Sequence, residues 1–125
     1  MEVIQFFEEN GNKKGIQTTE SGLQYKVIKE GEGGSPKAAD YVSVHYAGRL
    51  LDGTEFDSSY KRNQPAEFPV NGVIPGWVEA LQMMNEGSKW EVFIPPELGY
   101  GAQGAGGIIP PNAGLIFDIE LLKIK

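Results

Sequence analysis

The side chains that most often carry covalent or metal chemistry are scarce in this chain. It has no cysteine and a single histidine, His45. These counts exclude an ordinary zinc site, a cysteine nucleophile, and any Ser-His-Asp arrangement that does not use His45. We therefore expect neither a metal nor a cofactor.

A loop rich in glycine and proline, Pro95 to Gly114, carries the strongest functional signal. It holds six of the seventeen glycines and four of the eight prolines. Loops of this length are uncommon in compact domains and are usually binding loops or active-site covers. Tyr100 and the pair Ile108-Ile109 are displayed from its tight turns. A disordered linker is the alternative, but linkers seldom carry such residues ahead of a hydrophobic strand.

Length and charge narrow the class of protein. With 125 residues and 13.6 kDa, the chain fits one domain with a core of its own. A net charge of −6 and a pI near 4.8 argue against a nucleic-acid partner, which needs clustered Lys and Arg. No apolar run approaches the length of about 18 residues that a membrane span needs, and the N-terminus is acidic where a signal peptide is basic.

Alternating apolar and polar residues predict several short strands. An Asp52-Gly53 turn predicts a hairpin. The strands are expected at residues 23–28, 41–50, from Phe56, at 68–70, and on either side of the long loop at 89–94 and 115–122.

One clear helix is expected from Trp77 to Asn85, ending near Gly87, with Trp77, Leu81 and Met84 on one face. The pattern predicts an α+β fold in which a twisted antiparallel sheet of five or six strands wraps around this short amphipathic helix. Residues 1–20 are expected to form a short helical extension and linker, with a helix end at Asn10-Gly11, and residues 21–125 to form the domain.

Four motifs resemble the FK506-binding protein family of peptidyl-prolyl isomerases. They are VHYAGRLLDGTEFDSS, VIPGW, LGYGAQG and GGIIPPNAGLIFDIELL, in order, within a match from about Leu23 to Lys125. The N-terminal FFEENGNKKGIQTTESGLQYKVI is similar to bacterial macrophage infectivity potentiators, where a helix leads from a dimerisation region into the isomerase domain. This similarity implies that the chain is the catalytic domain of a longer protein, or a short relative of one. It also implies a periplasmic or cell-surface location, with a cytoplasmic one as the alternative.

The resemblance implies a proline-binding pocket. Its catalytic residues would be Tyr46, Phe56, Asp57, Trp77, Tyr100 and Phe117, and its binding residues Arg62, Val73, Ile74, Ile108 and Ile109. Two positions depart from the family. Ala66 stands where many members carry an aromatic ring, and Ala105 where some carry a histidine. We expect a shallower rim and an altered preference for the residue before proline.

In this interpretation Trp77 forms the floor, and three rings on strands form the walls. The Tyr100 hydroxyl and the backbone N–H of Ile74 would hold the carbonyl oxygens of the substrate. Each ring taken alone could be ordinary core packing, and Tyr100 could simply pack its loop.

Asp57 is expected at the pocket edge with Tyr46 and Arg62 as partners, because a buried charge needs partners. Its role would be to organise the site without proton transfer, and capping of the Ser58-Ser59 turn is the alternative. His45 is expected to face the opposite side of its strand, at the surface.

Rotation about a peptide bond needs no bond to break, although the twisted state lies about 18 to 20 kcal/mol above the planar one. A protein accelerates it by binding the twisted form more tightly than the planar one. An apolar box disfavours the more polar planar amide, and each 1.4 kcal/mol of differential binding gives about tenfold in rate.

The leading hypothesis is a peptidyl-prolyl cis-trans isomerase that acts on proline-containing polypeptides, with the macrolides FK506 and rapamycin as inhibitors. A module that binds proline segments or macrolides without turnover is the second hypothesis. A chaperone-like holdase is the third, but the flap domain that related holdases insert after the strand near Val70 is absent. We expect a monomer as the chain stands, which is compatible with its being part of a dimeric longer protein.

Overall fold

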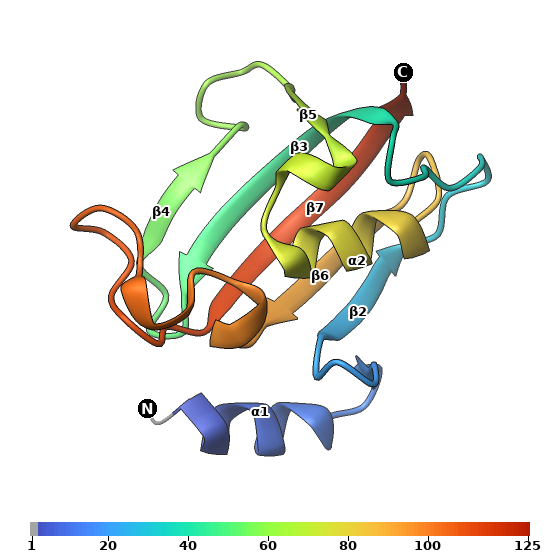
Figure 1. Cartoon of the computed structure of the whole chain (residues 1–125). Coiled ribbons are helices and arrows are strands. Elements are labelled where there is room, and N and C mark those ends of the chain that lie inside the picture. The colour runs from blue at the N-terminus through green and yellow to red at the C-terminus, as the bar shows by residue number, and fades with distance from the viewer. Residues whose placement is uncertain (1–2) are drawn as a thin grey trace.

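One antiparallel sheet organises residues 3–125, which the computed structural model describes (Figure 1). Its seven strands lie in the order β1-β2-β6-β7-β3-β4, and β5 pairs with the first half of β3. The strands are β1 (Gln17–Thr18), β2 (Gln24–Lys29), β3 (Tyr41–Leu50), β4 (Glu55–Ser58), β5 (Ala66–Pro69), β6 (Lys89–Ile94) and β7 (Leu115–Ile124).

Residue alternation gives the sheet an inner and an outer face. On β3, Val42, Val44 and Tyr46 are buried, whereas the residues between them are more exposed. On β7 the apolar residues at every second position join the same core cluster. Because successive side chains of a strand point to opposite faces, this pattern fixes which residues reach the helix side.

Helix α2 (Pro75–Met83) packs on the inner face through Trp77, Ala80 and Leu81. Figure 1 shows it lying across the sheet. It begins and ends two residues earlier than the pattern predicted. Pro75 occupies the first turn, where a missing N–H costs nothing, and Met84 is extended and fully buried in the core, which ends the helix.

Helix α1 (Val3–Gly11) ends at Gly11, as expected, and packs against the sheet. Its Phe6 ring lies 6.2 Å from the ring of Phe93. Asn10 Nδ2 donates to Gln24 Oε1 at 2.8 Å, and Gln24 Nε2 donates to the carbonyl of Phe7 at 2.9 Å. These bonds fix the C-terminal turn of α1 on β2. Among residues 3–125, neither α-helix has the length and hydrophobicity to span a bilayer.

The predicted α+β architecture with its short N-terminal helix is confirmed. The sheet reaches seven strands because it includes β1, whose two residues are too few to show an alternating pattern. Met1 and Glu2 of the predicted extension lie outside the described residues.

The long loop is ordered by its own short elements rather than being free of structure. Besides η1 (Val70–Gly72), the 3-10 helices are η2 (Pro96–Leu98) and η3 (Gly101–Gln103), both within the loop. Ala105 pairs with Ile109. The predicted pairing of its flanking strands, β6 and β7, is present. The loop therefore has an internal structure of its own, held between two paired strands.

Candidate active site

A small cavity of about 150 Å³ lies where the inner face of the sheet, the start of α2 and the long loop meet. Most of the residues predicted from the sequence line it, and Phe68 of β5 was missed. The lining residues are Tyr46, Phe56, Asp57, Phe68, Val73, Ile74, Trp77, Tyr100 and Phe117.

Aromatic rings pack around Trp77 at nearly right angles. The ring of Tyr46 lies 5.2 Å from the indole, that of Phe68 5.6 Å and that of Phe117 5.3 Å, with interplanar angles of 84°, 83° and 88°. Phe56 meets Phe117 in the same way, at 5.6 Å and 86°. Edge-to-face packing of this kind is favourable and holds each ring in one orientation. The cavity therefore has a preformed aromatic lining.

The indole N–H of Trp77 is buried and has no hydrogen-bond acceptor within residues 3–125. Orphan buried donors are rare in folded proteins. The rings of Tyr46, Phe68 and Phe117 pack around this indole. The floor of the cavity therefore combines an aromatic surface with one buried donor that has no partner in this part of the chain.

Gly48 on β3 makes room for two of the wall rings. A Cβ at this position would lie 2.6 Å from Cε1 of Phe117 and 2.8 Å from Cζ of Phe56. Any larger residue would displace both rings. Glycine inside a strand weakens the strand, so its presence in the sequence signals such a close approach. The sequence reasoning did not use this signal.

Asp57 lies at the edge of the cavity with both carboxylate oxygens engaged. Tyr46 Oη donates to Oδ2 at 2.5 Å, and Arg62 Nη1 donates to Oδ1 at 2.6 Å. Arg62 Nη2 also donates to Tyr46 Oη at 3.1 Å, which closes a three-residue ring of hydrogen bonds. The partners that the sequence predicted for Asp57 are therefore present.

The pKa values of this cluster keep the proton on the tyrosine. Burial raises the pKa of Asp57, but the hydrogen bonds from Tyr46 and Arg62, with the Arg62 charge, outweigh burial and bring that pKa below 3.8. Burial, followed by the hydrogen bond to Asp57, raises the pKa of Tyr46 above 10.0. At neutral pH the site holds a neutral phenol and a carboxylate anion.

Ser59 anchors the backbone of Tyr46. Its side chain is fully buried, and Oγ accepts the N–H of Tyr46 at 2.7 Å. The N–H of Ser59 donates to the carbonyl of Tyr46 at 2.9 Å. Oγ also lies 2.8 Å from Nδ1 of His45, whose ring stacks on Tyr60 at 4.8 Å. His45 faces away from the cavity, as expected, but it is hydrogen-bonded rather than a free surface residue.

Besides the indole N–H of Trp77, two donors at the cavity have no partner of their own within residues 3–125. Tyr100 is 38% exposed, and its hydroxyl makes no hydrogen bond within residues 3–125. The backbone N–H of Ile74, just before α2, likewise finds no acceptor in this part of the chain. Both remain available to carbonyl oxygens of a bound chain.

Three predicted binding residues lie outside the cavity lining. Ile109 is buried in the core and anchors the long loop. Ile108, in contrast, is 60% exposed on that loop. Arg62 stands at the margin, where it contacts Asp57 and Tyr46. Ala66 of β5 is partly buried against the core, and Phe68, two residues later, supplies aromatic wall instead.

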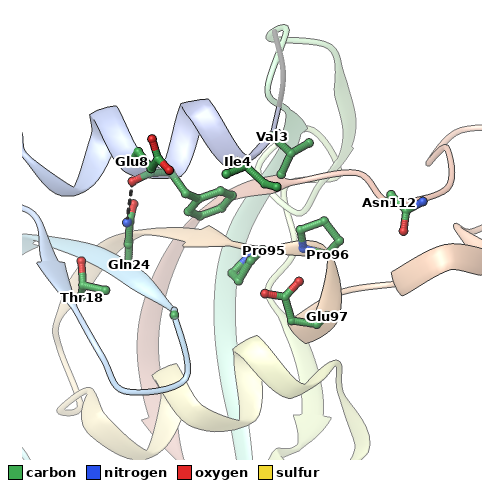
Figure 2. A pocket seen from close by; sticks show the side chains of 11 residues that line it. Val3, Ile4, Glu8, Thr18, Gln24, Pro95, Pro96, Glu97 and Asn112 are labelled. Atoms are coloured by element: carbon green, nitrogen blue, oxygen red, sulfur yellow. Dashed lines mark hydrogen bonds between the residues drawn. The ribbon is translucent and has the colours of Figure 1, made fainter.

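A larger groove lies between α1 and the segment Pro95–Glu97 (Figure 2). Its volume is about 800 Å³, and Val3, Ile4 and Phe7 of α1 form one side. It contains none of the predicted site residues. We therefore place the candidate active site in the small aromatic cavity.

The fold and the site define an α+β domain whose sheet and helix enclose an aromatic cavity beside a fixed carboxylate. The family model described as FKBP-type peptidyl-prolyl cis-trans isomerase matches residues 33–122. The model described as the domain amino terminal to FKBP-type peptidyl-prolyl isomerase matches residues 2–27. This chain belongs to the FKBP-type peptidyl-prolyl cis-trans isomerase family.

Similar proteins come from several bacteria. The FKBP-type 22 kDa peptidyl-prolyl cis-trans isomerase of Escherichia coli K12 is 59% identical over 98% of this chain and 60% of its own length. The isomerase Mip of Coxiella burnetii is 54% identical over 96% of this chain and 52% of its own length. The crystal structure of FkpA from Escherichia coli superposes with a TM-score of 0.94 at 47% identity, covering 98% of this chain and 57% of that one. The chain thus spans little more than half the length of these relatives.

Proposed function

We propose that this chain is a peptidyl-prolyl cis-trans isomerase that works without covalent chemistry. The observation that carries the proposal is the juxtaposition of an apolar aromatic cavity with two unpaired donors, Tyr100 Oη and Ile74 N–H. The cavity of about 150 Å³ is smaller than the roughly 300 to 1,000 Å³ of sites for drug-sized ligands. It suits one small ring, such as that of proline.

The cavity would lower the barrier by binding the twisted amide better than the planar one. The proline ring would lie over Trp77, with Tyr46, Phe56, Phe68 and Phe117 around it. These aromatic walls would replace the water around the planar amide with an apolar surface, which disfavours that more polar form. The two free donors would hold carbonyl oxygens of the bound chain and so fix its orientation. About 4 kcal/mol of differential binding corresponds to roughly a thousandfold in rate.

Asp57 would act on the substrate as a fixed negative charge rather than as a base. Its low pKa makes it a poor proton acceptor at neutral pH. With both oxygens held, it keeps the phenol of Tyr46 and the guanidinium of Arg62 in place. The field of this carboxylate at the cavity edge would polarise the rotating bond.

An NMR exchange assay on peptides that differ in the residue before proline tests the proposal. We expect the cis and trans resonances of X-Pro bonds to exchange far faster with the protein than without it. Binding without faster exchange would favour the second hypothesis, a module that grips proline segments. The free donors and the intact carboxylate cluster support the enzyme over that alternative.

We further propose that FK506 and rapamycin inhibit this chain, and that it is monomeric as it stands. The boundary at residue 20 between extension and domain remains a prediction. A longer protein containing this domain would be dimeric, with the chain before α1 supplying the contact. The relatives are longer than the part that this chain matches, so they have room for such a segment.

A further inference from the structure

A further hollow, of about 320 Å³, lies on the outer face of the sheet, opposite the aromatic cavity. On β6 it is lined by Glu91 and Phe93, whereas the intervening Val92 belongs to the core on the inner face. Successive strand residues point to opposite faces. The sheet itself therefore separates this outer hollow from Trp77.

The floor of the outer hollow is apolar. Phe93 and Ile116 are paired across β6 and β7 and, although they belong to the outer face, are only 6% and 7% exposed. Helix α1 packs beside Phe93, with the Phe6 ring 6.2 Å from that of Phe93. Ile16, after the helix, completes the apolar lining. An apolar group in the hollow would contact Phe6 and Ile16 and the small exposed parts of Phe93 and Ile116.

The rim of the same hollow is basic. Lys13, Lys14, Lys26 and Arg49 line it, which are four of the eleven Lys and Arg residues of a chain with net charge −6. Arg49 is paired with Glu91 at 2.6 Å. The three lysines form no ion pair within residues 3–125. Like charges brought together without a counter-charge repel one another, and an anion placed between them relieves that repulsion.

We propose that the outer hollow binds a small amphipathic anion, in which a carboxylate or sulfonate is attached to a compact aromatic or short alkyl group. The apolar group would rest on Phe6, Phe93 and Ile116, and the anion would meet the three unpaired lysines. Its volume lies at the lower end of the range for small-molecule sites, roughly 300 to 1,000 Å³. A hollow of this size suits a compact group better than an extended polypeptide. This proposal does not depend on the isomerase activity.

Titration with the fluorescent sulfonate 1-anilinonaphthalene-8-sulfonate tests the proposal. The variant Lys14→Glu/Lys26→Glu reverses two rim charges, and the control Lys37→Glu/Lys123→Glu makes the same change in net charge away from the hollow. We expect the dissociation constant to rise about tenfold or more in the rim variant and by less than about threefold in the control. Added salt should weaken binding to the parent protein. Equal weakening in the two variants would overturn the proposal.

Amide chemical shifts during the same titration locate the probe. We expect the shifts to centre on Phe93, Ile116 and Lys26, with the isomerisation rate of a short X-Pro peptide unchanged. Shifts centred on Trp77, or on the groove beside Pro95 (Figure 2), would place the probe elsewhere and contradict the proposal. N-Phenyl-1-naphthylamine, which lacks the sulfonate, should bind the hollow at least tenfold more weakly. Equal affinity for this neutral compound would disprove the role of the lysines.

Discussion

The hydroxyl of Tyr46 donates to Oδ2 of Asp57 across 2.5 Å, and this bond joins a wall ring of the aromatic cavity to the carboxylate at its edge. The ring of Tyr46 also packs edge-to-face on Trp77. The position of the carboxylate is therefore coupled to the position of the floor. We expect substitutions of Tyr46 or Asp57 to lower activity by more than their effect on the free energy of unfolding accounts for.

Ser59→Ala should lower both stability and activity. The substitution leaves the buried N–H of Tyr46 without an acceptor, which costs about 1 to 3 kcal/mol. It also frees the strand that carries the Tyr46 ring. Ser58→Ala is the matched control, because Ser58 Oγ accepts only a longer bond, 3.3 Å from the N–H of Lys61. Urea denaturation and peptide exchange rates measure the two effects, and equal losses in both variants would refute the anchoring role of Ser59.

Activity and stability should both stay nearly constant from about pH 5 to about pH 9, because Asp57 stays ionised and Tyr46 stays protonated across that range. The pKa of Asp57 is lowered in the fold, so its contribution to stability is present above the unfolded value of 3.8 and is lost as the pH falls through the lower folded value. The pKa of Tyr46 is raised, so its contribution is present below 10.0 and is lost as the pH rises through the folded value. NMR exchange rates across this range provide the measurement. Complete loss of activity on acidification above about pH 5 would contradict the assignment.

The strands follow from the sequence for a physical reason, whereas the site aromatics were expected from the family resemblance. Alternation along residues 41–50 and 115–124 reports a sheet with one buried face, which is a local pattern. The contribution of Phe68 depends instead on the pairing of β5 with β3, a contact between distant parts of the chain. The same holds for Gly48. The need for glycine at this position follows only from the positions of the Phe56 and Phe117 rings in the folded chain.

The long loop shows a second limit of sequence reasoning. Two neighbouring isoleucines of one motif differ in burial: Ile109 is buried and Ile108 is exposed. Local bonds set this difference, because Ala105 donates to the carbonyl of Ile109 at 2.9 Å and accepts its N–H at 3.0 Å. A pattern of residue types alone does not contain that geometry.

FK506 should quench or shift the fluorescence of Trp77, because its proline-like ring would stack over the indole. The chain has two tryptophans, and Trp90 stacks instead on Tyr25 at 4.2 Å, outside the cavity lining. Trp90→Phe should therefore keep both the affinity and the signal change. A signal that disappears in Trp90→Phe but persists in Trp77→Phe would remove Trp77 from the floor.

Deletion of residues 1–15 should leave kcat/KM on short X-Pro peptides unchanged, because the cavity residues all lie at or beyond Tyr46. It should lower the free energy of unfolding by about 1 to 3 kcal/mol, since Gln24 loses the partners Asn10 and Phe7. Light scattering should show a monomer with and without these residues. A dimer that disappears on deletion would instead make α1 an interface.

The most direct test of the account is the peptide exchange rate of Asp57→Asn beside that of Glu55→Gln. Each variant removes a carboxylate of β4 that forms an ion pair with a residue of the following bend. Glu55 pairs with Lys61 at 2.7 Å, and Asp57 pairs with Arg62 at 2.6 Å. We predict that Asp57→Asn lowers kcat/KM by about tenfold to a hundredfold, the scale of one lost charge-assisted hydrogen bond, and that Glu55→Gln changes it by less than about twofold. Urea denaturation curves should show that both variants are folded in the absence of urea. Parental activity in a folded Asp57→Asn variant would contradict the claim that this carboxylate organises the site.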